Sequence, residues 1–229
     1  MFKNPASDVI VVIPAFNEEA VISSVVSGVI EHGYRVVVVD DGSSDNTFKA
    51  ASAAGALCFR HRINRGKGAA TKTGIEAAKT LEPRVIVTMD GDNQHSAADI
   101  PALAAPILGA RCDVSLGIRT FHSSVMPSHR VAANHVGNFL TWLIHGLWVA
   151  DSQSGFRAFS LHAARLINTR SDRYEYESEV IREIRHHGLR YLEVPISVKY
   201  AAYDQSKKQR QNFTNGMKTV YKMIWGRIA

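Results

Sequence analysis

The chain has 229 residues, of which 45% are hydrophobic and 21% are charged, as is typical of a globular protein long enough to bury a substantial core. Its formal net charge of +6 suits an anionic partner, such as a nucleotide, a phospholipid surface or a nucleic acid, without choosing among them. The only two cysteines, Cys58 and Cys112, argue against a disulfide scaffold or a zinc site. Residues 1–10 lack the features of a signal peptide, so we expect a cytoplasmic protein.

Strand and helix patterns alternate through the first half of the chain. Short apolar runs predict five strands, at residues 9–13, 36–39, 57–60, 85–89 and 114–117. Between them, the sequence predicts helices at residues 18–32, from Ser44 or Asp45 to near residue 55, at 68–79 and at 99–108. This order of elements predicts an α/β fold with a mostly parallel, doubly wound sheet flanked by helices.

The second half has a different pattern. It predicts helices at residues 129–148, 161–168, 177–187 and 206–226. Residues 189–198 predict a strand that Pro195 either bends or restricts to a sheet edge. Residues 151–159 contain Ser and Gly and show little periodicity. No repeat or linker is evident, so we expect residues 1–229 to form a single domain.

The longest apolar stretch, residues 139–150, is too short for a membrane span, which needs about 18 uninterrupted apolar residues. The last predicted helix carries aromatic and apolar residues at helical spacing together with several Lys and Arg residues. Such a helix either packs on its own domain or lies in a membrane interface. The basic charge of the whole protein favours the membrane surface, so we expect a soluble or peripheral protein.

The most informative segment, Asp90-Gly91-Asp92-Asn93-Gln94-His95-Ser96, follows a predicted buried strand. Two carboxylates at the carboxyl end of such a strand lie where open α/β sheets bind ligands. A divalent cation accounts for Asp90 and Asp92 as ligands, and Gln94 can add a neutral oxygen. A turn rich in Asp, Gly and Asn is the common alternative.

Acidic and amide residues also follow the first two predicted strands. Asn17 and Glu18 come after Pro14, which we expect to stop the first strand, and Asp41 follows the second strand. Asp41 can accept hydrogen bonds from a base N–H group or a ribose hydroxyl. Taken alone, Asn17 and Glu18 are explained better by capping and by the dipole of the next helix.

A Gly-rich turn, Asn64-Arg65-Gly66-Lys67-Gly68, opens the predicted helix at residues 68–79. Its backbone N–H groups, with Arg65 and Lys67, could face a phosphate. The spacing matches neither the P-loop nor the G-x-G-x-x-G dinucleotide fingerprint, so the signal is weak on its own.

Two polar segments of the second half add candidates. Asp151, in Asp151-Ser152-Gln153-Ser154-Gly155-Phe156-Arg157, is either a catalytic carboxylate or part of a structural turn. Glu177 is a weak candidate for the acceptor side. Glu179 is better explained as a first-turn acid that suits the helix dipole.

The segments in this order resemble the family 2 glycosyltransferases of GT-A fold. The nearest likeness is to the branch that makes polyprenyl-phosphate sugars, of which dolichol-phosphate mannose synthase is typical. The matching segments begin at Pro14, Asp40, Asn64, Asp90, Ser154 and Gln205, and together they span about residues 9 to 208. Each motif is modest alone, whereas the ordered set is specific.

The resemblance implies a nucleotide-sugar donor bound by about residues 1–120, and an acceptor bound by about residues 121–229. On the donor side it assigns Pro14, Asn17, Glu18 and Asp41 to the nucleoside, Asp90, Gly91 and Lys67 to the rest of the donor site, and Asp90, Asp92 and Gln94 to Mg²⁺ or Mn²⁺. On the acceptor side it assigns Arg119 and Arg130 to a polyprenyl phosphate, with Asn134 one helical turn further on.

One departure from the family pattern concerns the donor diphosphate. The family often carries an arginine six residues before the Ser-Lys pair, and Ala201 occupies that position here. Lys199 or Lys207 could substitute for it. Many relatives also carry C-terminal membrane spans, and none is expected in this sequence. A membrane-protein partner and a homo-oligomer are open alternatives.

The chemistry implied is inverting transfer of a sugar to a phosphate that is already ionised, so no strong base is needed. A sugar-hydroxyl acceptor in glycan synthesis is the alternative, and Asp151 would then be the base. A sugar nucleotidylyltransferase is disfavoured, because this chain has no Gly-rich segment bearing Arg and Lys after the first predicted strand. We expect no nucleic-acid partner, because an acidic sheet edge repels phosphate backbones.

Overall fold

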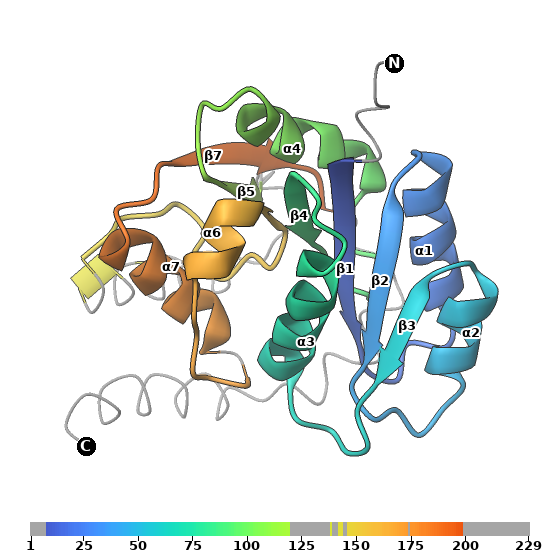
Figure 1. Ribbon diagram of the computed structural model, residues 1–229. Helices are drawn as coiled ribbons and strands as arrows, with labels where there is room; N and C mark the ends of the chain where they lie inside the picture. The colour runs from blue at the N-terminus through green and yellow to red at the C-terminus, as the bar shows by residue number, and fades with distance from the viewer. Residues whose placement is uncertain (1–7, 120–137, 139–141, 144–145, 174, 199–229) are drawn as a thin grey trace, which may run out of the picture.

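The computed structural model describes residues 8–119, 138, 142–143, 146–173 and 175–198 (Figure 1). Its strands are β1 (Val9–Ala15), β2 (Arg35–Asp40), β3 (Leu57–Arg60), β4 (Val85–Thr88), β5 (Val114–Arg119), β6 (Arg157–Ser160) and β7 (Tyr191–Ile196). Its helices are α1 (Ile22–Glu31), α2 (Thr47–Ala53), α3 (Lys67–Lys79), the 3-10 turn η2 (Ala97–Asp99), α4 (Ile100–Leu108), α6 (Leu161–Leu166) and α7 (Tyr176–His186). Every element predicted before residue 120 is present, with ends shifted by a few residues.

The seven strands form one mixed sheet in the order β3-β2-β1-β4-β6-β5-β7. Neighbouring strands are parallel except β6, which runs antiparallel to both β4 and β5. The expected α/β architecture with a mostly parallel sheet is therefore confirmed. β5 points the same way as β1, β2 and β4, so the carboxyl ends of all four strands lie at one edge.

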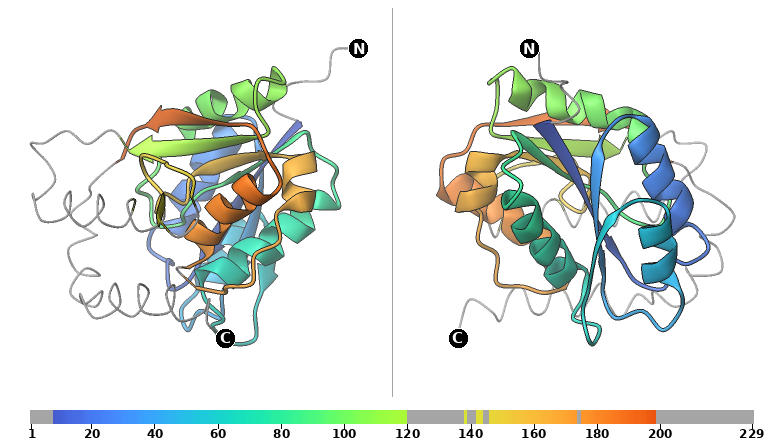
Figure 2. Two further views of the ribbon diagram at one scale, coloured as in Figure 1. Left: turned by 90° about the vertical axis from the view of Figure 1, so that its left-hand side faces the viewer. Right: turned by 45° about the vertical axis from the view of Figure 1, so that its right-hand side comes forward.

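Helices cover both faces of the sheet (Figures 1 and 2). Alternate residues of β1 divide the core, because successive side chains of a strand point to opposite faces. Val9, Val11 and Ile13 pack with α1, α2 and α4, whereas Ile10 and Val12 pack with α3, α6 and α7. This two-sided burial explains the unbroken apolar run of β1.

β6 is the strand that the sequence did not predict. Its four residues, Arg157-Ala158-Phe159-Ser160, do not form an apolar run, because they begin with a charged side chain and end with a serine. The strand nonetheless has consequences for the site. Because β6 is antiparallel and its first residue pairs with Thr88 and Leu116, the loop before it reaches the same edge as the loops after β4 and β5.

The two prolines in strands have different outcomes. Pro14 was expected to stop the first strand, and this is wrong, because β1 continues through Pro14 to Ala15. Pairing with β4 ends at Val12, so beyond it β1 pairs only with β2, where a missing N–H group is tolerated. Pro195 lies in β7, which is an edge strand, as one of the two predicted outcomes required.

The predicted helix at residues 206–226 lies outside the described residues, and the helix at 129–148 lies mostly outside them. Of the latter, residues 138, 142 and 143 are helical and residues 146–148 are not. None of the helices in the described ranges is long and apolar enough to cross a membrane.

Candidate active site

The loops that follow β1 and β2 are joined by hydrogen bonds at the carboxyl edge of the sheet. Asn17, which has a positive φ of 54°, donates its N–H to Ser43 Oγ at 2.9 Å, and its side-chain oxygen accepts from Ser44 N at 2.9 Å. Glu18 is buried and donates its N–H to Thr47 Oγ1 at 2.8 Å. The predicted nucleoside residues of the first loop are thus brought against the second loop.

Asp41 is buried, and protein donors surround its carboxylate. Oδ1 lies 2.7 Å from His61 Nδ1 and accepts from Arg65 N at 3.0 Å, while Oδ2 accepts from Gly66 N at 2.7 Å. His61 in turn lies 2.9 Å from Thr73 Oγ1 of α3 through its other ring nitrogen. Asp41 therefore ties the Gly-rich turn to the sheet edge.

Three N–H groups in and just after the Gly-rich turn are hydrogen-bonded within the protein. Besides the two that Asp41 accepts, Ala69 N donates to Asp172 O at 3.0 Å. Gly66 has a φ of 110°, and a Cβ there would collide with Asp172 O. These three N–H groups are therefore already paired within the protein, and the predicted phosphate contact of the turn stays a prediction, with the side chain of Lys67 as its clearest candidate.

Lys67 lies between two carboxylates from distant parts of the chain. Its Nζ is 2.7 Å from Asp90 Oδ1 and 3.0 Å from Glu177 Oε1 of α7. Burial opposes the charge on Lys67, but Asp90 and Glu177 outweigh it and raise the pKa of Lys67 above its ordinary value. Pro14, Lys67, Asp90, Gly155 and Glu177 line the same small pocket.

The acidic segment after β4 forms a tight turn. Asp92 Oδ1 accepts from Gln94 N at 3.1 Å, and Asn93 has a positive φ of 63°. Gly91 is packed closely, because a Cβ there would lie 3.1 Å from Pro14 O. The turn that was the alternative explanation of this segment is therefore present, and it directs Asp90 and Asp92 to one region.

The two aspartates of this turn differ in their tendency to ionise. Burial opposes ionisation of Asp90, but the charge on Lys67 outweighs it and holds the pKa of Asp90 below its ordinary range. Burial, followed by repulsion from Asp90, raises the pKa of Asp92 to about 6. A second positive charge would relieve this repulsion.

The donor set suits a hard divalent cation that completes its shell with other oxygens. Within the described ranges, no group of three or more His, Cys, Asp or Glu side chains is arranged to hold a metal ion. Mg²⁺ typically uses one or two carboxylates plus substrate phosphates and water, and Mn²⁺ accepts similar oxygen ligands. Asp90 and Asp92 fit a cation of this kind, with the phosphates coming from a substrate.

Arg119 and Asp151 form a bidentate ion pair at the same edge. Arg119 ends β5, and its Nε and Nη2 donate to Asp151 Oδ2 at 2.6 Å and Oδ1 at 2.8 Å. The N–H of Arg119 also donates to Asp151 Oδ2 at 3.3 Å. Two residues predicted to act separately are therefore in direct contact, and Asp151 is buried beneath the guanidinium group.

Two buried side chains shape the site without having been predicted to do so. His95 stacks on Phe156, with ring centroids 4.8 Å apart, and burial lowers the pKa of its imidazole. The guanidinium of Arg157 is buried and donates to the carbonyl groups of Ser152, Ser154 and Glu177. Both residues lie in motifs that the sequence singled out, but only three-dimensional contacts reveal what they hold.

Arg130, Asn134, Lys199, Ala201 and Lys207 lie outside the described residues. Their predicted roles toward the acceptor phosphate and the donor diphosphate therefore stay predictions.

Comparison with known proteins gives a consistent result. The profile of the family described as glycosyl transferase family 2 matches residues 10–166. An uncharacterized protein of Methanocaldococcus jannaschii is 40% identical over 227 residues, and the match covers 96% of this chain and 93% of that protein. The UDP-N-acetylglucosamine–dolichyl-phosphate N-acetylglucosaminyltransferase of Methanococcus voltae is 33% identical over 236 residues, covering 93% of each chain.

A solved structure shares the fold. Glucosyl-3-phosphoglycerate synthase of Mycobacterium tuberculosis, crystallised with Mn²⁺, UDP-glucose and phosphoglyceric acid, superposes with a TM-score of 0.66 at 19% identity. The match covers 96% of this chain and 83% of that one. The sheet, the motifs and these relatives agree: the chain belongs to glycosyl transferase family 2 and is a glycosyltransferase.

Proposed function

We propose that the enzyme moves a sugar from a nucleotide sugar, a GDP- or UDP-sugar, to a polyprenyl or dolichyl phosphate, with inversion at the anomeric carbon. The observation that carries this proposal is that two opposite kinds of charge lie at one sheet edge. The Asp90 and Asp92 carboxylates are suited to a metal-bound diphosphate, and the Arg119 guanidinium is suited to a second, separate phosphate. The name of the similar Methanococcus voltae protein supports a dolichyl-phosphate acceptor.

On the donor side, Asp90 and Asp92, together with Gln94, would hold Mg²⁺ or Mn²⁺ at the diphosphate. A divalent cation there would supply positive charge that stabilises the departing nucleoside diphosphate. The Lys67 ammonium lies 2.7 Å from Asp90 and adds a second, fixed positive charge beside that of the cation. Pro14, Asn17, Glu18 and Asp41 would hold the nucleoside at the joined loops after β1 and β2.

On the acceptor side, Arg119 would bind the lipid phosphate, with Arg130 as a second cation. An oxygen of that phosphate attacks the anomeric carbon from the face opposite the leaving group. The bond from this carbon to the donor diphosphate breaks, and the electron pair leaves with the diphosphate oxygen. The attacking phosphate is already ionised, so the site needs no strong base.

The alternative is a sugar-hydroxyl acceptor in glycan synthesis, which requires a base to remove the hydroxyl proton. Asp151 was the candidate for that role. Both of its oxygens accept from Arg119, at 2.6 and 2.8 Å, so they are not directed at an incoming hydroxyl. This contact favours the phosphate acceptor. A lipid acceptor also implies that the enzyme works at the membrane surface, and we propose the cytoplasmic face, where nucleotide sugars are available.

The test is an assay with a panel of radiolabelled GDP- and UDP-sugars, Mg²⁺ or Mn²⁺, and a short polyprenyl phosphate. We expect one donor to give a labelled product that partitions into organic solvent and needs both the cation and the lipid phosphate. Transfer of label only to a water-soluble or lipid-linked glycan would contradict the proposal and support the hydroxyl acceptor.

A further inference from the structure

We propose that Asn138 is a positioning residue that fixes the loop carrying Asp151, and through Asp151 sets the orientation of Arg119 toward the acceptor. The inference rests on the proposed function only for the identity of that acceptor. The contacts themselves belong to the protein alone.

The side-chain amide of Asn138 forms hydrogen bonds with the residues on both sides of Asp151. Asn138 is buried, with 2% of its surface exposed. Its Nδ2 donates to Ala150 O, and its Oδ1 accepts from Ser152 N at 3.0 Å and from Ser152 Oγ at 2.8 Å. Asparagine carries a donor and an acceptor on one short planar group, and here each of the two serves a different neighbour of Asp151.

Two further side chains form hydrogen bonds with the backbone of this loop. Glu193 of β7 accepts from Ala150 N through Oε1 at 2.6 Å. Arg157 of β6 donates from Nη2 to Ser152 O at 2.8 Å. The N–H and C=O groups of both Ala150 and Ser152 are thus bound by side chains from other segments. This leaves the backbone of Asp151 little freedom to shift or rotate.

The orientation of Asp151 determines that of Arg119. The guanidinium group donates two N–H groups to the two carboxylate oxygens, so its plane follows the plane of the carboxylate. A guanidinium that binds a phosphate must be held at a fixed angle to it. Substituting Asn138 should therefore change the orientation of the Arg119 guanidinium relative to the acceptor, while both Arg119 and Asp151 are kept.

The test uses the full chain with three substitutions. Asn138→Ala removes both hydrogen-bonding functions, and Asn138→Asp keeps the shape while placing a carboxylate oxygen against Ala150 O. Ser160→Ala is the matched control, because Ser160 Oγ accepts from Ala163 N at the far end of β6, away from the site. The control is matched because the Asn138 and Ser160 substitutions each remove a buried or part-buried hydrogen bond between a side chain and the backbone.

The first readout is the NMR signal of the Arg119 Nε–H group, which requires no substrate. In the wild type and in Ser160→Ala we expect this proton to be protected from exchange with solvent by its bond to Asp151. In both Asn138 variants we expect the signal to shift and exchange faster. Wild-type protection in folded Asn138→Asp and Asn138→Ala would overturn the inference.

The second readout is steady-state kinetics with a short polyprenyl phosphate. We expect the Asn138 variants to lower kcat/KM for this acceptor by about 10- to 100-fold, with the KM for the donor unchanged. An equal loss on both substrates, or the same loss in Ser160→Ala, would mean a general effect on stability and contradict the inference. If the wild type does not use polyprenyl phosphate while the Nε–H readout behaves as expected, the proposed acceptor fails and the positioning role stands.

Discussion

The ammonium group of Lys67 lies 2.7 Å from Oδ1 of Asp90, although the two residues belong to different loops of the sheet edge. Gly155, from a third segment, lies directly against this contact. A Cβ at position 155 would come within 2.7 Å of Lys67 Nζ and 2.8 Å of Asp90 Oδ1. The contact between Lys67 and Asp90 therefore requires a residue without a Cβ at position 155.

Gly155→Ala should separate Lys67 from Asp90 and lower kcat/KM by about 100-fold, because the donor site loses its geometry. The matched control is Gly28→Ala in α1, where an added Cβ meets nothing within 4 Å. That control should keep full activity and gain about 0.5 to 1 kcal/mol of stability, since alanine is the better helix former. Kinetics and urea unfolding of both variants check the pair. Full activity in Gly155→Ala would show that this contact is unimportant.

Asp92→Ala should abolish sugar transfer at any concentration of Mg²⁺ or Mn²⁺, because it removes one of the two carboxylates that suit the cation. Asp113→Asn is the control, since Asp113 pairs with Arg190 at 3.1 Å at the amino end of β5, away from the site. Turnover and Mn²⁺ binding by electron paramagnetic resonance are the measurements. The metal assignment fails if Asp92→Ala retains near-wild-type turnover.

Asp41→Asn should destabilise the protein as well as weaken donor binding. In one orientation, the new amide NH₂ would point at the N–H of Gly66, which now donates to the carboxylate. In the other orientation, it would point at the N–H of Arg65 and at His61 Nδ1. Leaving such buried groups unpaired costs about 1 to 3 kcal/mol. Urea unfolding gives the stability, and titration with GDP or UDP gives the affinity. Wild-type stability combined with lost nucleotide binding would instead mean that Asp41 serves the ligand alone.

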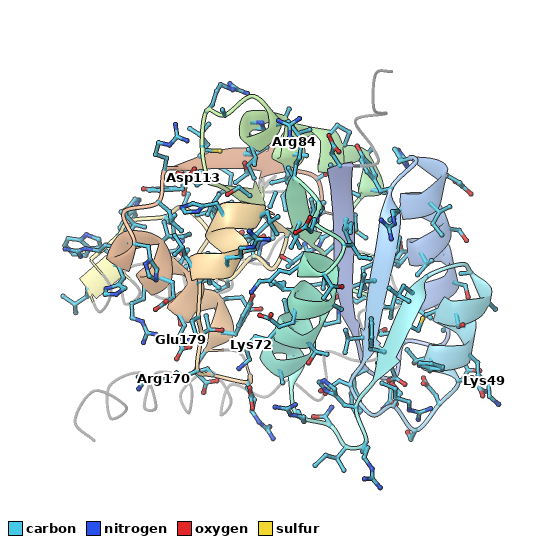
Figure 3. All side chains as sticks on the ribbon, in the orientation of Figure 1. Lys49, Lys72, Arg84, Asp113, Arg170 and Glu179 are labelled. Atoms are coloured by element: carbon cyan, nitrogen blue, oxygen red, sulfur yellow. The ribbon has the colours of Figure 1, made fainter. Side chains whose placement is uncertain are left out.

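Glu179 makes stability depend on pH in a defined direction. It accepts from Arg170 N at 2.7 Å and from Ser171 N at 3.0 Å, and Lys72 of α3 donates to Arg170 O at 3.3 Å (Figure 3). Burial opposes its ionisation, but the hydrogen bonds from Ser171 and Arg170 outweigh burial and hold the pKa of Glu179 below its ordinary value of 4.5. A lowered folded-state pKa contributes stability that is present above pH 4.5 and is lost as the pH falls through the folded-state pKa.

The variant Glu179→Gln isolates this contribution. We expect wild type to exceed Glu179→Gln in free energy of unfolding at pH 7, and the difference to shrink as the pH falls below 4.5. Urea unfolding of both proteins across this range gives the difference directly. A difference that does not change with pH would mean that the charge on Glu179 contributes nothing.

The sequence predicted the sheet edge well because apolar runs followed by acidic residues mark where buried strands end. Asp41, Asp90 and Asp92 were located in this way, after β2 and β4, whereas Arg119 at the end of β5 was assigned only through the family resemblance. Local patterns carry no information about contacts between distant segments. The pairing of Arg119 with Asp151 depends on β6 running antiparallel, and β6 is not the apolar run by which the other short strands were predicted. The contacts of Asn138 could not be predicted from the sequence either, because its partners lie 12 and 14 residues away.

Transfer of the sugar to a phosphate oxygen leaves the anomeric carbon bonded to a phosphate in the product. The most direct measurement is NMR of the organic-extractable product made from a donor labelled with ¹³C at its anomeric carbon. We expect an anomeric carbon coupled to phosphorus, with a configuration opposite to that in the donor. An anomeric carbon in the product that shows no coupling to phosphorus, or that retains the donor's configuration, would contradict this expectation.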